Sequence, residues 1–374
     1  MLPDGLDSRF VYYYLRYIKP IAEQRATGTT FKELSGGVAA KLPFLVAPER
    51  EQRRIADKLD TVLARVDACR DRLALVAPML KQFRQSVLAA AVAGQLTEAW
   101  RRENADLVHS AHDAKTNAEE DVPEIERWLV SLPKSWRIRR ASEAVAADAE
   151  IVYGIVQPGP KLAEGVPYVR GMDIVDGRIQ VHQLLRTSPA IAKKYARAAL
   201  KGGDVLLGII RATKVAIVPA ELEGANITQG TARFRPSNSL STRYLAIVLE
   251  APATQRWLHA HYRGIDMPGL NLADVRRTPI PVPPEDEQAE IVRRVDSLLA
   301  IADGLETKLK SAQSAMDRLT PAILAKAFRG DLVPQDPSDE SAAALLKRLK
   351  AQRSGESKAS KGARTKRAQS VAGR

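Results

Sequence analysis

The chain has 374 residues, of which 45% are hydrophobic and only 5% aromatic, and its formal net charge is +13. That length allows two or more domains with buried cores, whereas no apolar run approaches the roughly 18 residues of a membrane span. One cysteine and five histidines exclude a disulfide framework and leave little room for nucleophilic or metal catalysis. We therefore expect a cytoplasmic protein with no membrane partner.

The positive charge is concentrated in two parts of the chain. Residues 1–135 carry +1, 136–280 carry +8, 281–346 carry −5 and 347–374 carry +9. A basic globular segment between nearly neutral or acidic segments is typical of a module that binds a polyanion. The alternative is an ordinary soluble protein with scattered surface lysines.

Residues 1–47 hold too little apolar sequence to bury a core of their own. They predict one helix over 6–21 and a short apolar strand over 42–46. A helix followed by an apolar strand returns within 240–282. We therefore expect 1–47 to be the C-terminal remnant of a domain whose complete copy lies at 132–283.

Two long segments carry the same apolar repeat, offset by 236 residues. Steps of four and three residues alternate in the first segment at Ile55, Leu59, Val62, Val66, Cys69, Leu73, Val76, Leu80, Phe83 and Val87, and in the second at Ile291, Val295, Leu298, Ala302, Leu305, Leu309, Ala312, Met316, Leu319 and Ile323. Such a stripe is the seam of a coiled coil. We expect the two helices to pair as an antiparallel coiled coil, with Leu59 on the seam and Leu63 beside it.

Both long helices have matching start and stop signals. They begin at 48–52 (Pro-Glu-Arg-Glu-Gln) and at 284–288 (Pro-Glu-Asp-Glu-Gln), where proline suits the first turn and the carboxylates face the positive end of the helix dipole. Gly94 and Gly330 are the predicted left-handed stops.

Two prolines and the cysteine lie inside these helices. Pro78 and Pro321 are expected to kink or divide them, so that a hairpin of two shorter helices within each copy is an alternative. Cys69 falls on the seam and is interpreted as a small buried apolar residue.

The rest of the chain differs in character from the helical repeats. Residues 99–131 are polar and acidic, which indicates a linker with one helix near 123–131. From 132 onward, short apolar runs punctuated by Gly and Pro predict a β-rich domain. Its expected elements are strands at 167–170, 205–209, 215–218 and 231–234 and helices at 242–250 and 255–261. Beyond a short helix at 336–350, the tail Arg353–Arg374 is almost devoid of apolar residues and is predicted to be disordered.

Motifs of catalysis are missing from the sequence. It contains no phosphate-binding loop, no His-Glu-x-x-His pair, no dinucleotide-binding turn and no methyltransferase segment of the Asn-Pro-Pro-Tyr kind. His109 with His112 and His259 with His261 have spacings that suit a metal, but no cysteine or carboxylate is arranged around them. We expect surface histidines, no catalytic residue, no metal site and no cofactor bound by this chain.

Short motifs spread over nearly the whole chain share a pattern. Besides the two Pro-x-x-Glu-Gln helix starts and the two Ala-x-x-Gly-x-Leu helix ends, they are Leu132-Pro133-x-x-Trp136, Tyr153-Gly154, and the runs at 165–174, 177–179, 203–206, 226–233 and 332–337. In combination they resemble the DNA-specificity subunit of type I restriction–modification systems. The pattern departs from that family at the front, where most of the first recognition domain is expected to be missing.

The resemblance implies an α+β fold in which β-rich target-recognition domains alternate with two long conserved helical regions. It implies that the chain binds double-stranded DNA sequence-specifically, while methylation and cleavage belong to separate modification and restriction subunits. S-adenosylmethionine, ATP and magnesium are then expected on those partner subunits, and the helical regions are implied to dock the modification subunits. The expected parts are a remnant at 1–47, a first conserved helical region and linker at 48–131, a complete target-recognition domain at 132–283, a second conserved helical region at 284–350 and a basic tail at 351–374.

Contact with DNA needs cations for phosphates and hydrogen-bonding side chains for base edges. Candidates in or beside the predicted loops are Gln157, Arg170, Arg178, Arg211, Lys214, Thr228, Gln229 and Arg233, and Lys193 and Lys194 are better suited to phosphates. The alternative for each is a solvated side chain. For Arg170 and Arg233 it is a structural partner of a buried carboxylate or carbonyl.

Three other interpretations remain open from the sequence. The chain is a truncated scaffold that binds partner subunits without reading DNA, a half-subunit that homodimerises on a symmetric bipartite site, or the detached recognition portion of a single-chain restriction enzyme. The tail either adds salt-sensitive affinity for nucleic acid or only improves solubility.

Overall fold

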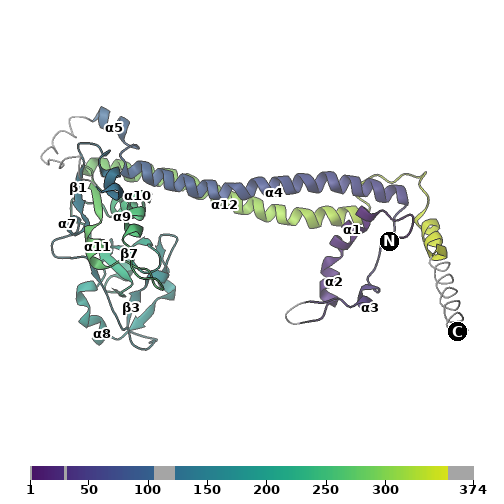
Figure 1. Ribbon diagram of the computed structural model, residues 1–374. Helices are drawn as coiled ribbons and strands as arrows, with labels where there is room; N and C mark the ends of the chain where they lie inside the picture. The colour runs from purple at the N-terminus through teal and green to yellow at the C-terminus, as the bar shows by residue number, and fades with distance from the viewer. Residues whose placement is uncertain (1, 29–31, 105–122, 353–374) are drawn as a thin grey trace, which may run out of the picture. The chain divides into compact units, whose positions relative to one another are not determined.

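The computed structural model describes residues 2–28, 32–104 and 123–352. The predicted α+β class is confirmed, since two long helices accompany a β-rich domain (Figure 1). The tail after 352 and the pair His109 and His112 lie outside the described residues.

The chain divides into two compact units. The first comprises Met1–Pro78 and Glu306–Arg374, and the second comprises Met79–Leu305. Each of the two 44-residue helices, α4 (Glu49–Val92) and α12 (Glu285–Phe328), contributes one part to each unit.

Within residues 2–28 and 32–48 of the first unit, which the structure describes, three short helices precede α4: α1 (Ser8–Tyr17), α2 (Lys19–Arg25) and α3 (Gly36–Ala39). The carboxylate of Asp7 caps α1 by accepting from the backbone N–H groups of Arg9 and Phe10. The helix predicted over 6–21 is divided at Ile18, because Pro20 in the first turn of α2 has no N–H with which to continue α1. Toward the C-terminus, the described part of this unit also contains helical residues at 342–352.

The apolar strand predicted over 42–46 is not formed. Its counterpart in the second unit is β11 (Pro279–Val282), which pairs antiparallel with β1 (Arg137–Arg140). Among the described residues of the first unit, no strand lies beside 42–46. A strand without a neighbour gains no ladder hydrogen bonds, so the apolar pattern alone does not form one.

The β-rich domain occupies most of the second unit. Its other strands are β2 (Val152–Tyr153), β3 (Val166–Val169), β4 (Ile174–Val175), β5 (Arg178–Ile179), β6 (Leu185–Thr187), β7 (Val205–Gly208), β8 (Val215–Ile217), β9 (Asn226–Ile227) and β10 (Thr231–Phe234). Besides α4 and α12, the described residues of the unit form the helices and 3-10 helices α5 (Glu98–Glu103), η2 (Glu124–Leu129), α7 (Ala141–Ala144), η3 (Gly171–Asp173), η4 (Val181–Gln183), α8 (Pro189–Lys194), η5 (Ala196–Ala198), η6 (Ala220–Leu222), α9 (Thr242–Glu250), α10 (Pro252–Ala260) and α11 (Leu272–Arg277). The four predicted strands correspond to β3, β7, β8 and β10, and α9 covers the predicted range.

Besides the two-stranded pairs β1-β11 and β4-β5, the described residues of this domain form two larger sheets. The larger has the order β2-β10-β7-β8 and the smaller β6-β3-β9, in which β3 and β9 run parallel. Helix α9 packs on β7 and β8, and its Tyr244 is completely buried with Phe234 and Trp257 in the main core. The register β10 to β7 sets Ala232 opposite Leu207.

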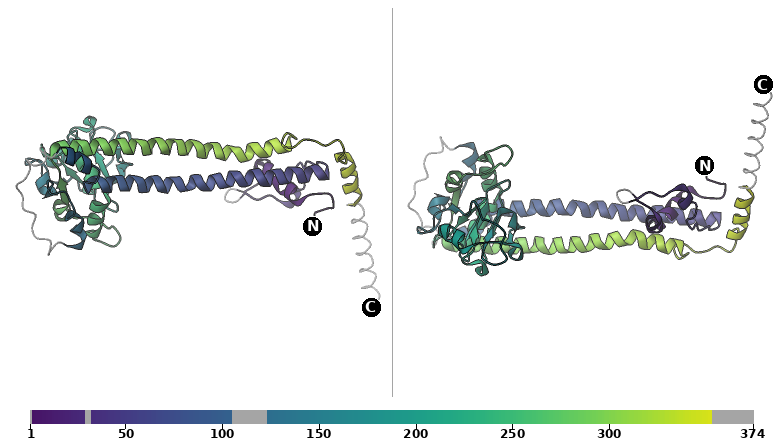
Figure 2. Two further views of the ribbon diagram at one scale, coloured as in Figure 1. Left: turned by 90° about the horizontal axis from the view of Figure 1, so that it is seen from above. Right: turned by 90° about the horizontal axis from the view of Figure 1, so that it is seen from below.

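Helices α4 and α12 pair antiparallel, as predicted. In the first unit Arg70 of α4 donates to the carbonyl of Met316 (3.0 Å) and lies 3.9 Å from the carboxylate of Asp317. In the second unit Arg84 forms an ion pair with Asp303 at 2.7 Å. Moving forward along α4 therefore means moving backward along α12, and the two helices lie side by side in both views of Figure 2.

Neither proline divides its helix, so the alternative of two shorter helices in each copy is wrong. Pro78 and Pro321 lie inside α4 and α12, and both are exposed. On an exposed face water hydrates the carbonyl that the missing N–H leaves free, which limits the cost of an interior proline. Gly94 and Gly330 end the helices with φ of 72° and 86°, as predicted.

Along the predicted seam, one of the two positions per heptad is buried or half-buried throughout, whereas the other is buried only at Ile55 and Ile291 and is half-buried or exposed further along each helix. Leu59, Val66, Leu80 and Val87 are buried. Cys69, Phe83, Leu305 and Leu319 are exposed instead of buried. Leu63, which was expected beside the seam, is only 4% exposed. A straight helix has about 3.6 residues per turn, so a stripe with a strict 3.5-residue repeat rotates out of a flat contact by about 20° per heptad.

At the start of α12, the side chain of Gln288 holds the preceding segment by three hydrogen bonds, an arrangement that we call the glutamine clasp. The side-chain oxygen of Gln288 accepts from the backbone N–H of Ser241, the residue that caps α9, at 2.8 Å. Its amide nitrogen donates to the carbonyls of Ser239 (2.9 Å) and Pro283 (3.0 Å). One side chain thereby fixes the start of α9 to the start of α12.

Gln52 forms the same glutamine clasp, with three equivalent hydrogen bonds, at the start of α4. Gln52 accepts from the N–H of Asp7, the cap of α1, at 2.9 Å. It donates to the carbonyls of Gly5 (3.2 Å) and Ala47 (2.8 Å). The glutamine therefore has the same role in both Pro-x-x-Glu-Gln motifs, which is to fix the start of the long helix to the start of a short helix earlier in the chain.

The glutamate of the motif differs between the copies. Glu287 is fully buried and accepts from the indole N–H of Trp136 (2.9 Å) and the hydroxyl of Thr97 (2.7 Å), and it is paired with Arg101. Its carboxylate thus joins α12 to the segment after α4 and to the entrance of the β-rich domain.

Glu51, the equivalent of Glu287 in α4, is buried without such donors. Burial raises the pKa of its carboxyl; Arg54 lowers that pKa and Asp339 raises it. Asp339 is itself engaged by Arg54 at 2.6 Å. The ionised form of Glu51 is therefore disfavoured in the folded chain.

We expect Glu51→Gln to stabilise the first unit at neutral pH. The folded pKa lies above the unfolded value, so the penalty is absent below the unfolded pKa and fully present above the folded pKa. Thermal unfolding at pH 7.5 is expected to show a Tm a few degrees higher than that of the wild type, with the gain shrinking toward pH 4. A gain that is equal at both pH values contradicts this assignment.

Candidate nucleic-acid interface

Four loops of the β-rich domain meet on one surface, which we call the loop face: residues 155–158, 170–173, 209–214 and 228–230. Ile155 forms a bridge with Thr228, and its carbonyl accepts from the N–H of Gln229 at 3.0 Å. The N–H of Ile209 donates to the carbonyl of Gly230 at 3.0 Å. These bonds hold loops from different strands side by side.

Glycines permit this close approach. A Cβ on Gly154 would lie 1.8 Å from the carbonyl oxygen of Ile227, and one on Gly171 would lie 3.5 Å from that of Gly230. Only a residue without a side chain fits at Gly154. The loop face is therefore built on backbone packing, which leaves its outward side chains available to a ligand.

Several predicted residues lie exposed on the loop face. Gln157, Arg211 and Gln229 are exposed, and Thr228 is half-buried. Arg211 has a left-handed backbone with φ of 65°, and its N–H donates to the carbonyl of Pro268 at 2.7 Å. A non-glycine residue held in this conformation is strained, a cost often found at functional sites.

Two predicted cations on this face have internal partners. Arg170 binds the buried carboxylate of Asp173 through two nitrogens, at 2.7 and 3.0 Å, so its alternative reading as the partner of a buried carboxylate matches the geometry. The half-buried Lys214 donates its ammonium to the carbonyl of Ile174 at 2.9 Å. Both side chains shape the loops, and neither is presented freely to a ligand.

Arg233 is not available for DNA contact, which corrects the prediction. It is 2% exposed on β10 and donates to the carbonyls of Glu150 (2.9 Å) and Arg197 (3.2 Å). Burial, and then the neighbouring Arg235, lower the pKa of its guanidinium. The apolar residues around Arg233 had placed it correctly in a strand, but the sequence does not show that the side chain points inward.

The remaining candidates are exposed but lie on other elements. Arg178 is exposed on the β4–β5 hairpin, and Lys193 and Lys194 are exposed at the end of α8. Helix α8 is fixed by the amide of Asn226, which donates to the carbonyl of Tyr195 at 3.2 Å. These three cations suit phosphate contacts beside the loop face.

The histidine pair at 259 and 261 has a packing role. His261 stacks on Trp257 with ring centroids 3.9 Å apart, and one ring nitrogen lies 2.7 Å from the carbonyl of Trp257. The described residues contain no cluster of histidine, cysteine or carboxylate side chains suited to a metal ion.

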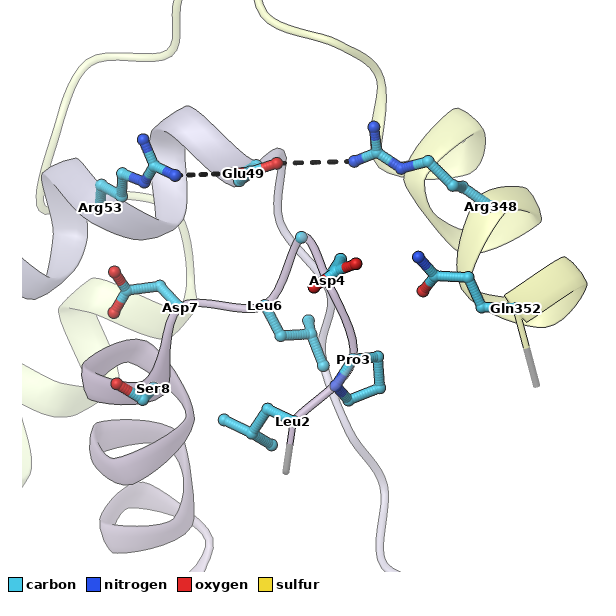
Figure 3. Close-up of a pocket in the computed structure, with 11 residues that line it drawn as sticks. Leu2, Pro3, Asp4, Leu6, Asp7, Ser8, Glu49, Arg53, Arg348 and Gln352 are labelled. Carbon is cyan, nitrogen blue, oxygen red and sulfur yellow. Dashed lines mark hydrogen bonds and ion pairs between the residues drawn. The ribbon is translucent and has the colours of Figure 1, made fainter. Parts of the chain in front are cut away.

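A hollow of about 660 Å³ in the first unit is a different kind of site (Figure 3). Its cations are already neutralised, since Glu49 pairs with Arg53 at 2.7 Å and with Arg348 at 3.5 Å. The acidic side chains of Asp4 and Asp7 also line it. With two guanidinium groups against three carboxylates in its lining, this hollow lacks the excess of positive charge that a polyanion requires.

The sequence did not reveal a fifth loop, residues 263–268, next to the loop face. The carbonyl of Pro268 accepts from Arg211, and Gly269 forms a bridge with Ile210. Gly264 and Pro268 signal a turn, but the contact with the loop after β7 spans more than fifty residues. It follows from the sheet topology rather than from local sequence.

The described part of the second unit thus carries a β-rich domain, with its converging loops, beside the paired segments of α4 and α12. Residues 160–312 match the family described as type I restriction modification DNA specificity domain. The EcoBI specificity subunit of Escherichia coli, a type I restriction enzyme subunit, is 34% identical over 96% of this chain and 75% of its own length. The EcoDI specificity subunit of the same species is 31% identical over 96% of this chain and 80% of its own.

Solved structures agree in fold. The crystal structure of the HsdS subunit from Thermoanaerobacter tengcongensis is 21% identical and covers 87% of this chain and 71% of that chain, with a TM-score of 0.50. The chain belongs to the family of type I restriction enzyme specificity subunits. The expectation of a non-catalytic specificity subunit agrees with this membership, and none of the described helices is long and apolar enough to span a bilayer.

Proposed function

We propose that this chain directs a type I restriction–modification complex to its target by reading duplex DNA through the loop face of residues 132–283. The observation that carries the proposal is the convergence of Gln157, Arg211 and Gln229, all exposed, from loops that follow different strands. The surrounding residues 136–280 carry +8, which attracts the phosphate backbone.

The side chains divide into two tasks. Gln157 and Gln229 have the paired donor and acceptor that recognise adenine in the major groove, and Arg211 suits the two acceptors of guanine. Arg178, Lys193 and Lys194 lie on other elements and neutralise phosphates, which positions the duplex without reading it. Arg170 acts indirectly by holding the turn at Asp173.

Partner subunits are part of the proposal. In the second unit, α4 and α12 leave the apolar side chains of Met79, Phe83, Ile301 and Leu305 exposed. Such side chains on a paired helical frame suit docking of a modification subunit. S-adenosylmethionine, ATP and magnesium would be bound by modification and restriction subunits, and the restriction subunit would join through the assembled complex.

Selection from random duplexes tests the reading function. The full chain, alone and with a modification subunit, is incubated with the pool, and bound DNA is sequenced. A bipartite or single enriched sequence supports the proposal. Binding of the modification subunit without any enriched sequence would establish the scaffold interpretation instead.

Arg211→Gly is expected to weaken binding to the selected duplex about tenfold while leaving the fold intact. The substitution removes the guanidinium, and glycine also relieves the left-handed backbone strain at φ 65°. Fluorescence anisotropy measures the Kd, and thermal unfolding is expected to give an equal or higher Tm. Arg127→Ala, an exposed arginine on η2, is the matched control and should bind normally. Loss of affinity in both variants would indicate nonspecific charge attraction only.

A further inference from the structure

The loop 263–268 after α10 carries an apolar side chain at its tip. Ile265 is 97% exposed, more than any other large hydrophobic residue among those described, and Met267 is 56% exposed. Full hydration of an isoleucine gives up the roughly 1.5–3 kcal/mol that burial of such a side chain contributes. An isoleucine in this position suits a partner that buries it.

The tip is firmly anchored. Arg263 and Gly269 exchange two backbone hydrogen bonds of 2.9 Å, and Gly264 turns the chain with φ of 92°. The N–H of Leu270 donates to the carbonyl of Ile209 at 2.8 Å. A Cβ on Gly269 would lie 2.9 Å from that same carbonyl oxygen. The loop base is thus packed tightly on the loop after β7, and its apolar tip is presented by a fixed hairpin.

The charge at the hairpin base favours a polyanion. Arg263, at 3.2 Å, and Arg277 both pair with the one buried carboxylate of Asp274. Two cations facing one anion leave an excess of positive charge, and Arg211 adds to it through its place beside Pro268. Asp266 at the tip is exposed and opposes this charge locally.

We propose that the hairpin 263–268 is an apolar wedge, with Ile265 inserting at a base step of the bound duplex and Met267 packing beside it. Apolar side chains that enter DNA in this way unstack one step and kink the duplex, at a cost of a few kcal/mol. The cost is lowest at flexible pyrimidine–purine steps, so the wedge adds selectivity at a position that no hydrogen bond reads. This inference rests on the proposed reading of duplex DNA by the loop face.

The test uses the full chain and the duplex obtained by selection, with 2-aminopurine placed at each position in turn. Wild-type protein is expected to raise the fluorescence severalfold at one step, because the base there loses its stacking. Ile265→Ser is expected to abolish this rise and to weaken binding about tenfold, whereas Ile265→Leu retains both. The exposed Val130, which precedes the domain, supplies the control Val130→Ser.

A loss of folding would not explain weaker binding by Ile265→Ser. A side chain that is 97% exposed contributes no packing, so this variant should unfold at the wild-type temperature. Unchanged fluorescence and affinity in Ile265→Ser overturn the wedge while leaving the reading function intact. Failure of the wild-type chain to select any duplex overturns both proposals. A rise at no position in the wild-type complex also rejects the wedge.

Discussion

Glu287→Gln is expected to destabilise the second unit by about 3 kcal/mol, or to lower its Tm by about 6–12 °C. The carboxylate is fully buried and receives Trp136, Thr97 and Arg101 together. A neutral amide accepts with only one oxygen, so Arg101 loses its counter-charge in a buried setting, and one donor faces an NH₂ group instead of an acceptor. Differential scanning calorimetry of the full chain measures the loss.

Controls separate this effect from the general role of acidic residues at a helix start. Glu285→Gln removes an exposed carboxylate from the same first turn and is expected to cost only about 0.3–1 kcal/mol through the helix dipole. Trp136→Phe removes one of the three donors and should lie between the two. Equal losses in Glu285→Gln and Glu287→Gln would show that the three-way junction contributes nothing beyond the dipole.

Leu63→Asp is expected to destabilise the first unit as strongly as Leu59→Asp, by about 4 kcal/mol. Both leucines are buried in the cluster that contains Leu324 and Phe328, so either aspartate loses apolar burial and places a charge without a partner in it. Had the strict 4-3 seam been present, Leu63 would lie beside the contact and tolerate the change better.

Leu75→Asp is the matched control on the same helix. Leu75 is 59% exposed, and its replacement is expected to change the free energy of unfolding by less than about 1 kcal/mol. Urea unfolding followed by circular dichroism gives all three values. A Leu63 variant that resembles the Leu75 variant would restore the seam phase predicted from the repeat.

The elements that local chemistry determines were predictable from the sequence. Gly94 and Gly330 stop their helices because only glycine enters the left-handed region freely, and α9 follows its serine cap. The contact phase of the long helices was less predictable, since it depends on how two cylinders with 3.6 residues per turn meet. The strand expected over 42–46 failed because strand formation needs a neighbour, which no local pattern supplies.

In the candidate interface, too, residue types and loops could be predicted from local sequence, whereas the burial of individual side chains could not. Gln157, Arg211 and Gln229 could be selected by residue type and by their place in loops, and the structure brings them together. Arg233 has the same chemistry but is buried, because both faces of β10 are covered and all four residues of the strand are buried. Ile265 escaped notice because an isoleucine in a short run gives no sign of exposure.

The glutamine clasps at Gln52 and Gln288 affect which amino-acid substitutions the segments that they hold can tolerate. Each glutamine touches only backbone groups of the segments that it joins: one N–H and two carbonyls. Every residue type has a backbone carbonyl, and every type except proline has a backbone N–H. The hydrogen bonds of the glutamine therefore do not depend on which side chains the joined segment carries. The β-rich domain can therefore diverge in sequence while its attachment to the start of α12 stays the same.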